Sequence, residues 1–387
     1  MSIGTHTGWL VIVCFAMTMA GCAYALAAAM VTRRFAAESD AVAAISPGVT
    51  ILKPLRGAEA GLYDNLASFC NQSYPGPVQI LFGVQDPADA AIAAVNRLVA
   101  DLPGRDLELV IHSHVCGPNP KVANLVGMQG RIRHGVVIIS DTDIAVAQDY
   151  LSRIVAALTL PNVGLVTCLY RGAARAGPWA RLASMAIDYH FLPDVLVGIR
   201  LGLARPCFGS TVALRRETLA AIGGFEAFLG YLADDYAMGD AVRAAGMQVA
   251  IPPFIVVHSC TEQSAGELLR HELRWARTVR AISPLGYAGL VITHPLPFAL
   301  LAAWLMGFGP LALSVVAASI ACRLVLQVQV DHTLRVSLNR WWLGPLRDFL
   351  SFVIYVAGFF VSVVTWRGDR YKLQADGTLM PIGEPKT

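Results

Sequence analysis

Val136-Val-Ile-Ile-Ser-Asp-Thr-Asp143 is the stretch that decides the fold, because four β-branched apolar residues run directly into two carboxylates. Such a run predicts a short buried strand. A second stretch, Val78-Gln-Ile-Leu-Phe-Gly-Val-Gln-Asp86, has the same form and ends on an acid. Ligands of open α/β sheets bind beyond the carboxyl ends of the strands. The sequence therefore predicts a polar site at one edge of a sheet.

Further strand-like and helix-like segments alternate around these two. Residues 49–53 and 107–111 are short and rich in β-branched residues, whereas residues 89–98 and 121–131 have helical spacing. Strands separated by helices of this length predict an α/β fold with a mostly parallel sheet flanked by helices.

The composition indicates a membrane protein. Of 387 residues, 55% are hydrophobic and only 15% are charged, against about 25% charged in soluble domains. The apolar excess lies near the two ends, which leaves residues 48–285 as one globular domain. The net charge of +3 and the lack of a basic run with interleaved aromatics exclude a nucleic-acid partner. The eight cysteines form no CxxC pair, so we expect free thiols and no zinc site.

Residues 8–31 are free of charge and are followed by Arg33 and Arg34. The run is long enough for an N-terminal transmembrane anchor, and the arginines place the next domain in the cytoplasm. A cleaved signal peptide is the alternative, with residues 25–29 as a processing site. No Lys or Arg precedes the run, and the run is longer than the apolar region of a signal peptide. Both features favour an uncleaved anchor.

Residues 290–366 are predicted to form a C-terminal transmembrane region of about three spans, followed by a tail, 367–387. The run 295–330 reads as a tight hairpin turning at Gly309-Pro310, or as one long span. Residues 349–366 form a further apolar run. The hairpin reading keeps Arg335, Arg340 and Arg347 on the cytoplasmic side of the membrane, whereas the single-span reading places these three arginines on the other side.

The segment 178–206 is apolar but interrupted by charges and prolines. It reads either as an interfacial stretch that admits a lipid acceptor or as ordinary core packing. His190 within it is expected to be a structural histidine rather than a catalytic one.

Two acidic motifs are candidates for chemistry. Asp141 and Asp143 on one turn can hold Mg²⁺ or Mn²⁺ together with a pyrophosphate, although such a turn can also be merely solvated. Asp234 and Asp235 begin a helical segment. They are either ordinary residues of a helix N-terminus, or one of them is the base that takes the proton of an attacking hydroxyl.

A basic segment follows at 264–280. On a helix, Arg270, His271, Arg274 and Trp275 broadly share one face. Arginine clamps phosphate oxygens and tryptophan forms an apolar wall. Alternatively, a basic helix beside a membrane contacts anionic headgroups.

These motifs occur in the order of a known pattern: D1, D2, D3 and (Q/R)xxRW. Asp86, Asp141 and Asp235 match the three acids, and Arg274 and Trp275 match the RW pair. The chain resembles inverting family-2-like glycosyltransferases of the ceramide glucosyltransferase branch, family 21. It departs from that pattern twice, with His271 at the Q/R position and with Asp143, a second acid that eukaryotic ceramide enzymes lack. Segments similar to bacterial hopanoid-biosynthesis-associated glycosyltransferases are Ile51–Gly57, Phe82–Pro87, Gly164–Gly172, Cys207–Thr211 and His271–Arg277.

The resemblance implies a GT-A-like domain and a role for each matched residue. Asp86 should contact the uracil or ribose, and Lys121 should help hold the nucleotide. Asp141 and Asp143 should bind the donor phosphates through Mg²⁺ or Mn²⁺. Asp235 should be the base, and Arg274 with Trp275 should secure the pyrophosphate. Lys53 and Arg56 read either as donor contacts or as a solvated basic loop.

The implied reaction is transfer of glucose or N-acetylglucosamine from a UDP-sugar to a lipid hydroxyl, on a hopanoid polyol or a ceramide-like acceptor, with inversion. The resemblance places the enzyme in the bacterial inner membrane with its catalytic domain in the cytoplasm. The competing readings are a processive polysaccharide synthase, which usually needs more spans, and a non-catalytic membrane scaffold, which has no physical reason to keep the acids. The sequence identifies neither the sugar nor the acceptor.

Overall fold

The computed structural model describes residues 2–38, 45–113, 116–335, 341–360, 363–366, 369–373 and 378–381. They form two compact units. The sheet unit comprises Ser39–Arg181, Pro206–Gln263 and Val363–Thr387, and the helical unit comprises Met1–Glu38, Leu182–Arg205 and Ser264–Ser362.

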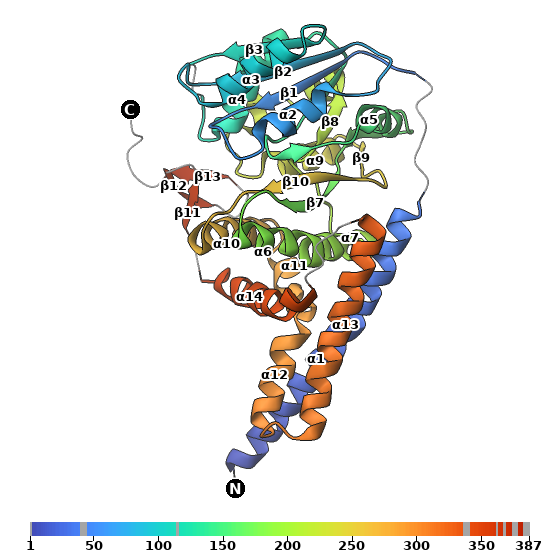
Figure 1. Ribbon diagram of the computed structural model, residues 1–387, viewed down its shortest axis with the longest axis vertical. Coiled ribbons are helices and arrows are strands. Elements are labelled where there is room, and N and C mark those ends of the chain that lie inside the picture. Colours follow the sequence, from blue (N-terminus) through green and yellow to red (C-terminus); the bar gives the residue numbers. More distant parts are fainter. Residues whose placement is uncertain are drawn as a thin grey trace. The chain divides into compact units, whose positions relative to one another are not determined.

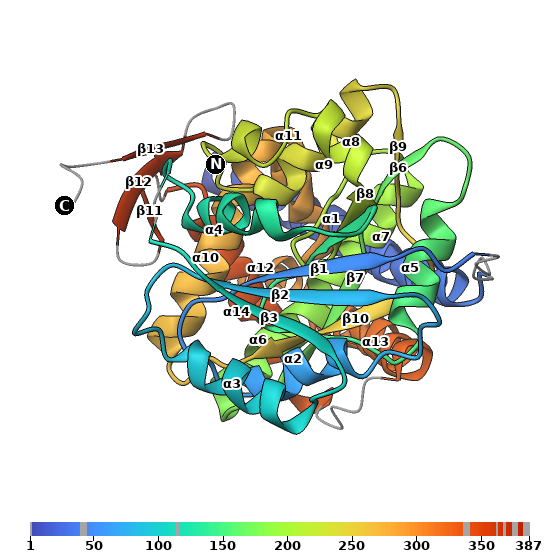
Figure 2. The same ribbon diagram turned by 90° about the horizontal axis from the view of Figure 1, so that it is seen from above.

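A seven-stranded sheet forms the centre of the sheet unit (Figures 1 and 2). Its strands are β1 Val49–Pro54, β2 Val78–Val84, β3 Asp106–Ile111, β4 Val136–Ile139, β6 Val163–Val166, β8 Val212–Arg215 and β9 Gln248–Ala250. The spatial order is β3-β2-β1-β4-β8-β6-β9, and all neighbours are parallel except β8, which is antiparallel to β4 and β6. The prediction of an α/β fold with a mostly parallel sheet is confirmed, with β8 making the sheet mixed.

Helices pack against this sheet and form the core with it. They are α2 Leu62–Cys70, α3 Ala91–Asp101, α4 Pro120–Met128, α5 Tyr150–Leu158, α8 Arg216–Ala221 and α9 Asp234–Ala244. The four strands and two helices predicted from the pattern are all present within a few residues. Asn119 fixes the start of α4, because its side chain accepts hydrogen bonds from two backbone N–H groups and Pro120 follows at the first turn.

A small sheet lies beside the main one, with the order β5-β10-β7. Its strands are β5 Ile144–Ala145, β7 Leu169–Ala174 and β10 Ile255–Cys260. β5 directly follows the Asp141–Asp143 turn and pairs with β10, so that His258 lies opposite Ile144. This pairing fixes the carboxyl end of β4 against a strand that is more than 100 residues later in the chain.

The C-terminal prediction needs correction. The run 349–366 was expected to continue as an apolar span, but the helix that contains its first part ends at Ala357 and Val363–Trp366 is strand β11. β11 pairs with β12 Asp369–Leu373, which pairs with β13 Leu379–Pro381. Part of the predicted tail is therefore an antiparallel sheet, since β-branched and aromatic residues in β11 favour a strand. Residues 367–368, 374–377 and 382–387 of that tail lie outside the described residues.

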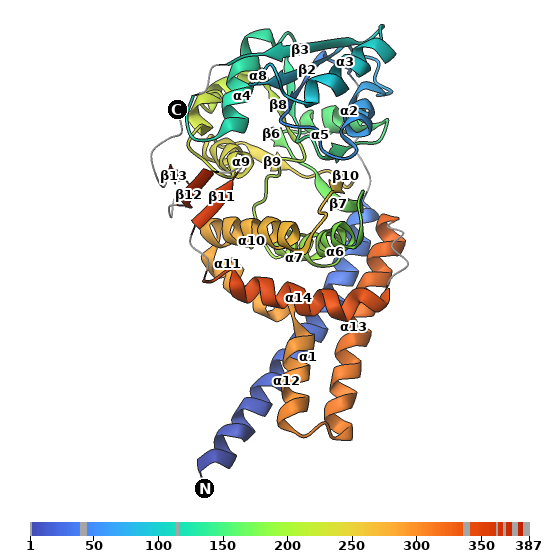
Figure 3. The ribbon, with the colours of Figure 1, turned by 60° about the vertical axis from the view of Figure 1, so that its left-hand side comes forward.

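The helical unit contains the long apolar helices of the chain (Figures 1 and 3). Its helices are α1 Ser2–Ala36, α7 Leu192–Arg200, α10 Ala265–Ile282, α11 Pro284–Gly289, α12 Pro295–Leu305, α13 Pro310–Leu334 and α14 Gly344–Ala357. Helix α6, Pro178–Ala186, continues into α7 through a π-helical turn, Ile187–Phe191. Among described residues, three segments are long and apolar enough to cross a membrane: Gly8–Ala36, Pro178–Arg200 and Pro310–Leu334. A fourth is possible only if a bent pair, Pro284–Thr293 with Pro295–Leu305, counts as one span.

The expected hairpin after the globular domain is present. α12 and α13 lie side by side with α1 (Figures 1 and 3). The chain turns between α12 and α13 at residues 306–309. The prediction of two short helices is wrong for α13, which has 25 residues. The side of the membrane on which each end lies stays a prediction.

The segment 178–206 is helical and largely covered by protein. In its apolar window 67% is buried, against 28% for the windows of α1 and α13, which favours the core-packing reading. The Arg323 guanidinium donates a hydrogen bond to His190 Nε2 at 2.9 Å, and the same ring nitrogen lies 2.9 Å from an Asp348 oxygen. It is the structural histidine that the sequence predicted.

Candidate active site

The carboxyl end of β4 carries Asp141 and Asp143, as the sequence predicted. Lys53 of β1 reaches the same turn, because its ammonium donates hydrogen bonds to the Asp141 carbonyl at 2.6 Å and to the Ser140 hydroxyl at 3.3 Å. Lys53 is fully buried and lies over the Phe69 ring. The solvated-loop reading is therefore wrong for Lys53, while Arg56 is exposed. Burial lowers the Lys53 pKa to about 7 against the opposing pull of the two aspartates.

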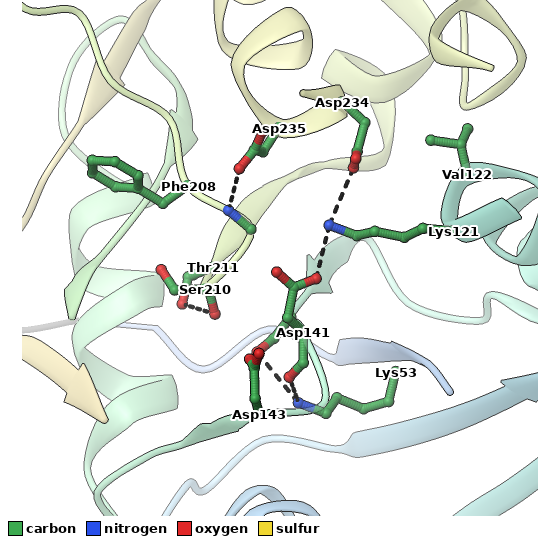
Figure 4. A network of polar contacts seen from close by, with 12 residues as sticks. Lys53, Lys121, Val122, Asp141, Asp143, Phe208, Ser210, Thr211, Asp234 and Asp235 are labelled. Carbon is green, nitrogen blue, oxygen red and sulfur yellow. Dashed lines mark hydrogen bonds and ion pairs between the residues drawn. The ribbon is translucent and has the colours of Figure 1, made fainter. Parts of the chain in front are cut away.

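Lys121, at the start of α4, joins the β4 turn to α9 (Figure 4). Its Nζ lies 2.8 Å from Asp141 Oδ1 and 3.2 Å from Asp234 Oδ2. Burial acts to lower the Lys121 pKa, but the surrounding carboxylates of Asp141, Asp234 and Asp235 outweigh it and raise the pKa. For Asp141, burial raises the pKa of the carboxyl group, and the Lys121 ammonium opposes this rise. One cation thus holds carboxylates from two distant motifs in one site.

The backbone of Gly209 makes a second link between the same two motifs. Its N–H donates to Asp235 Oδ2 at 2.6 Å, and its carbonyl accepts from the Asp141 N–H at 3.0 Å. A Cβ at this position would lie 2.3 Å from Asp141 Oδ2, so the close approach requires glycine. Burial, followed by the neighbouring Asp234 charge, raises the Asp235 pKa to about 7. A carboxyl group with this pKa is suited to accept a proton near neutral pH.

His258 of β10 is a part of the site that the sequence motifs did not reveal. Its Nε2 lies 3.2 Å from Asp143 Oδ2, and its ring packs near Tyr170. Burial acts to lower the His258 pKa, but the Asp143 carboxylate outweighs it and raises the pKa well above the ordinary value. The pairing of β5 with β10 produces this contact, and no local sequence signal marks it.

The remaining predicted residues lie elsewhere. Asp86 is exposed after β2, and its carboxylate accepts the Ala88 N–H. Among the described residues, no hydrogen bond or ion pair joins Asp86 to the Asp141 cluster. Arg274 and Trp275 lie on α10 in the helical unit, where the Trp275 ring meets the His271 ring at 4.5 Å. Their position beside the acidic cluster therefore stays a prediction.

The donor set at the β4 turn fits a hard divalent cation. The side chains of Asp141 and Asp143 are 37% and 29% exposed, so both offer carboxylate oxygens to an incoming ion. In the described part of the chain, no three or more His, Cys, Asp or Glu side chains are arranged so that they could hold a metal ion by themselves. Mg²⁺ and Mn²⁺ suit such a site, because they are commonly held by one or two carboxylates with substrate phosphates and water completing the shell.

Known proteins resemble this chain over most of its length. The family described as Glycosyl transferase family 21 matches residues 13–379. Ceramide glucosyltransferase 1 of Caenorhabditis elegans is 25% identical over 348 residues, which cover 86% of this chain and 73% of that protein. An N-acetylglucosaminyltransferase of Azorhizobium caulinodans is 23% identical over 249 residues, or 62% of each protein.

Among solved structures, a mannosyltransferase from Pyrobaculum calidifontis in complex with GDP-Man and Mn²⁺ is similar at a TM-score of 0.52. It is 20% identical, and the match covers 91% of this chain and 99% of that one. The likeness shows the GT-A-like fold that the sequence predicted. Since one family matches nearly the whole chain, the protein belongs to glycosyl transferase family 21.

Proposed function

We propose that the protein is a membrane-bound, inverting glycosyltransferase that moves glucose or N-acetylglucosamine from a UDP-sugar to a lipid hydroxyl. The observation that carries this proposal is the joining of Asp141, Asp234 and Asp235 through Lys121 and the Gly209 backbone. The named activities of the ceramide glucosyltransferase and N-acetylglucosaminyltransferase relatives support the two sugars. The long apolar helices support a lipid acceptor, a ceramide-like lipid or a hopanoid polyol.

In the proposed reaction, the acceptor oxygen forms a bond to the anomeric carbon while the bond from that carbon to the phosphate oxygen breaks. Asp235 takes the hydroxyl proton, and the nucleoside diphosphate leaves. The Gly209 N–H keeps the Asp235 carboxylate oriented. Lys121 is a buried cation at the phosphate end of the site. A bound Mg²⁺ or Mn²⁺, held by Asp141 and Asp143, would offset the negative charge of the leaving group.

The roles of Asp86, Arg274 and Trp275 belong to the proposal as well. Asp86 would contact the uracil or ribose beyond β2, and Lys53 would support the Asp141 turn from below the donor. Arg274 and Trp275 would secure the pyrophosphate from α10. We further propose that the enzyme lies in the bacterial inner membrane, with residues 48–285 as the cytoplasmic catalytic domain.

Two variants separate the base from the donor site. Asp235→Asn should abolish transfer but retain donor binding, because only proton acceptance is lost. Asp143→Ala should weaken metal-dependent binding of the UDP-sugar. Asp240→Asn is the matched control, since Asp240 is an exposed carboxylate on the same helix as Asp235.

The assay incubates the full chain with UDP-glucose or UDP-N-acetylglucosamine and lipid extract, and product mass identifies the sugar and the acceptor. Donor binding is measured separately by calorimetry. An equal loss of donor affinity in Asp235→Asn and Asp143→Ala would contradict the division of roles. A polymeric product would favour a processive synthase, and the absence of donor hydrolysis and transfer would favour a scaffold.

A further inference from the structure

Helix α14 carries a stripe of exposed apolar side chains along one face. Leu346, Phe349, Val353 and Val356 are 56%, 49%, 45% and 38% exposed. With 3.6 residues per turn, these four positions lie within about 80° of one another around the helix. We call this surface the α14 stripe. Exposed aromatic residues flank it along the chain: Trp341, Trp342 and Phe360.

The opposite face of α14 is charged and buried. The Arg347 guanidinium forms a paired contact with the Glu272 carboxylate of α10, at 2.8 and 2.6 Å. The Asp348 carboxylate receives hydrogen bonds from Arg323 of α13 at 2.9 and 3.0 Å. Rotation of the helix about its axis would leave these buried charges uncompensated. The two ion pairs therefore fix the direction in which the stripe faces.

α14 is too short to cross a bilayer. Its 14 residues span about 21 Å, against about 30 Å for the hydrocarbon core. Figures 1 and 3 show α14 lying across the direction of α1 and α13 within the same unit. A short helix whose exposed face is apolar and which has tryptophans at its end suits the plane of a membrane surface.

We propose that the α14 stripe, with Trp341 and Trp342, lies in the boundary between headgroups and acyl chains of the bilayer that α1 and α13 cross. Lipid is the occupant because α1 and α13, in the same unit, also leave most of their apolar windows uncovered. The stripe continues the lipid-facing surface of that unit at the depth where tryptophan is favoured. The inference goes beyond the proposed function, since it holds whatever sugar or acceptor the enzyme uses.

The test measures depth in nanodiscs of phosphatidylcholine and phosphatidylglycerol. A nitroxide on a non-natural amino acid replaces one residue at a time at 346, 349, 353 and 356, which leaves the eight native cysteines in place. Accessibility to oxygen and to a nickel chelate gives the depth of each label. Positions 313, 320 and 328 on α13 are the matched control, since Leu313, Ile320 and Val328 are similarly exposed.

For α14 we expect four nearly equal depths, about 5–10 Å below the phosphates. For α13 we expect a gradient that approaches 20 Å between positions 313 and 328, because each residue of a helix rises about 1.5 Å. A gradient approaching 15 Å along α14 would show a membrane-spanning helix and overturn the proposal. Labels on α14 that the nickel chelate reaches as readily as a label at exposed Val99 of α3 would show that the stripe faces water. Labels that neither reagent reaches would show that protein covers the stripe. Either result would overturn the proposal.

Each labelled chain must elute as a single species with an unchanged unfolding midpoint. Because all four sites are exposed, a label that disturbs one of them leaves three that still define the depth profile. The measurement needs no sugar donor, so its failure and the failure of the proposed function are distinguishable.

Discussion

Replacing Lys121 with methionine removes a side chain that contacts both Asp141 and Asp234. The lost contacts are 2.8 and 3.2 Å long, and the side chains of Lys121 and Asp234 are only 12% and 7% exposed. Removing one partner of a buried ion pair costs about 3–5 kcal/mol. Since the Asp141 side chain is 37% exposed and water screens it, we expect a loss of about 2–3 kcal/mol. For a domain of this size, that corresponds to a fall of roughly 5–10 °C in the unfolding midpoint.

The midpoint is measured on the full chain in detergent, at pH 8 with EDTA. Lys121→Arg keeps the charge and should lie closer to the wild type than Lys121→Met does. Adding Asp234→Asn to Lys121→Met should recover part of the loss, because it removes one uncompensated carboxylate. The loss should shrink as the pH falls, because burial raises the Asp141 pKa and the Lys121 ammonium that opposes this rise is gone. A Lys121→Met midpoint within 1 °C of the wild type at pH 8 would refute the view that this ammonium stabilises the site.

Three further outcomes follow from the same site. His258→Asn should lower Mn²⁺ affinity by about 10–100-fold, measured by spin resonance titration, and an unchanged affinity would show that His258 does not orient Asp143. The Asp235 pKa of about 7 lies above the value of this group in the unfolded chain, so the contribution of Asp235 to folding stability is present below about pH 4 and is lost as the pH rises to 7. In EDTA, the unfolding midpoint of Asp235→Asn should therefore fall less over this pH range than the midpoint of the wild type. Transfer should stop in EDTA and return with Mn²⁺ or Mg²⁺, whereas transfer that persists in EDTA would exclude a role for a divalent ion.

Local pattern was sufficient for the parts of the fold that depend on neighbouring residues. The run from Val136 to Asp143 predicted both a buried strand and the position of its acids, because β-branched residues and a following polar turn are local signals. Asp234 and Asp235 were placed correctly at a helix start for the same reason.

Contacts between distant segments were beyond such signals. His258 follows Asp143 by more than 100 residues, and only the pairing of β5 with β10 brings them together. Gly209 was visible in the segment from Cys207 to Thr211, but its role depends on the approach of Asp141. The prediction of an apolar span at 349–366 was wrong, because hydropathy summed along the chain does not distinguish a helix with one apolar face from a helix that is apolar on all sides.

The backbone link at Gly209 has a mechanical consequence. The Gly209 N–H donates to the Asp235 carboxylate and the Gly209 carbonyl accepts from the Asp141 N–H, so that two rigid peptide planes, which meet at the Gly209 Cα, connect the Asp235 carboxylate to the β4 turn. In the proposed reaction, a displacement of the β4 turn on donor binding would therefore reach the Asp235 carboxylate through one residue of backbone. Donor binding and the position of the proposed base would then be coupled through the backbone of a single residue.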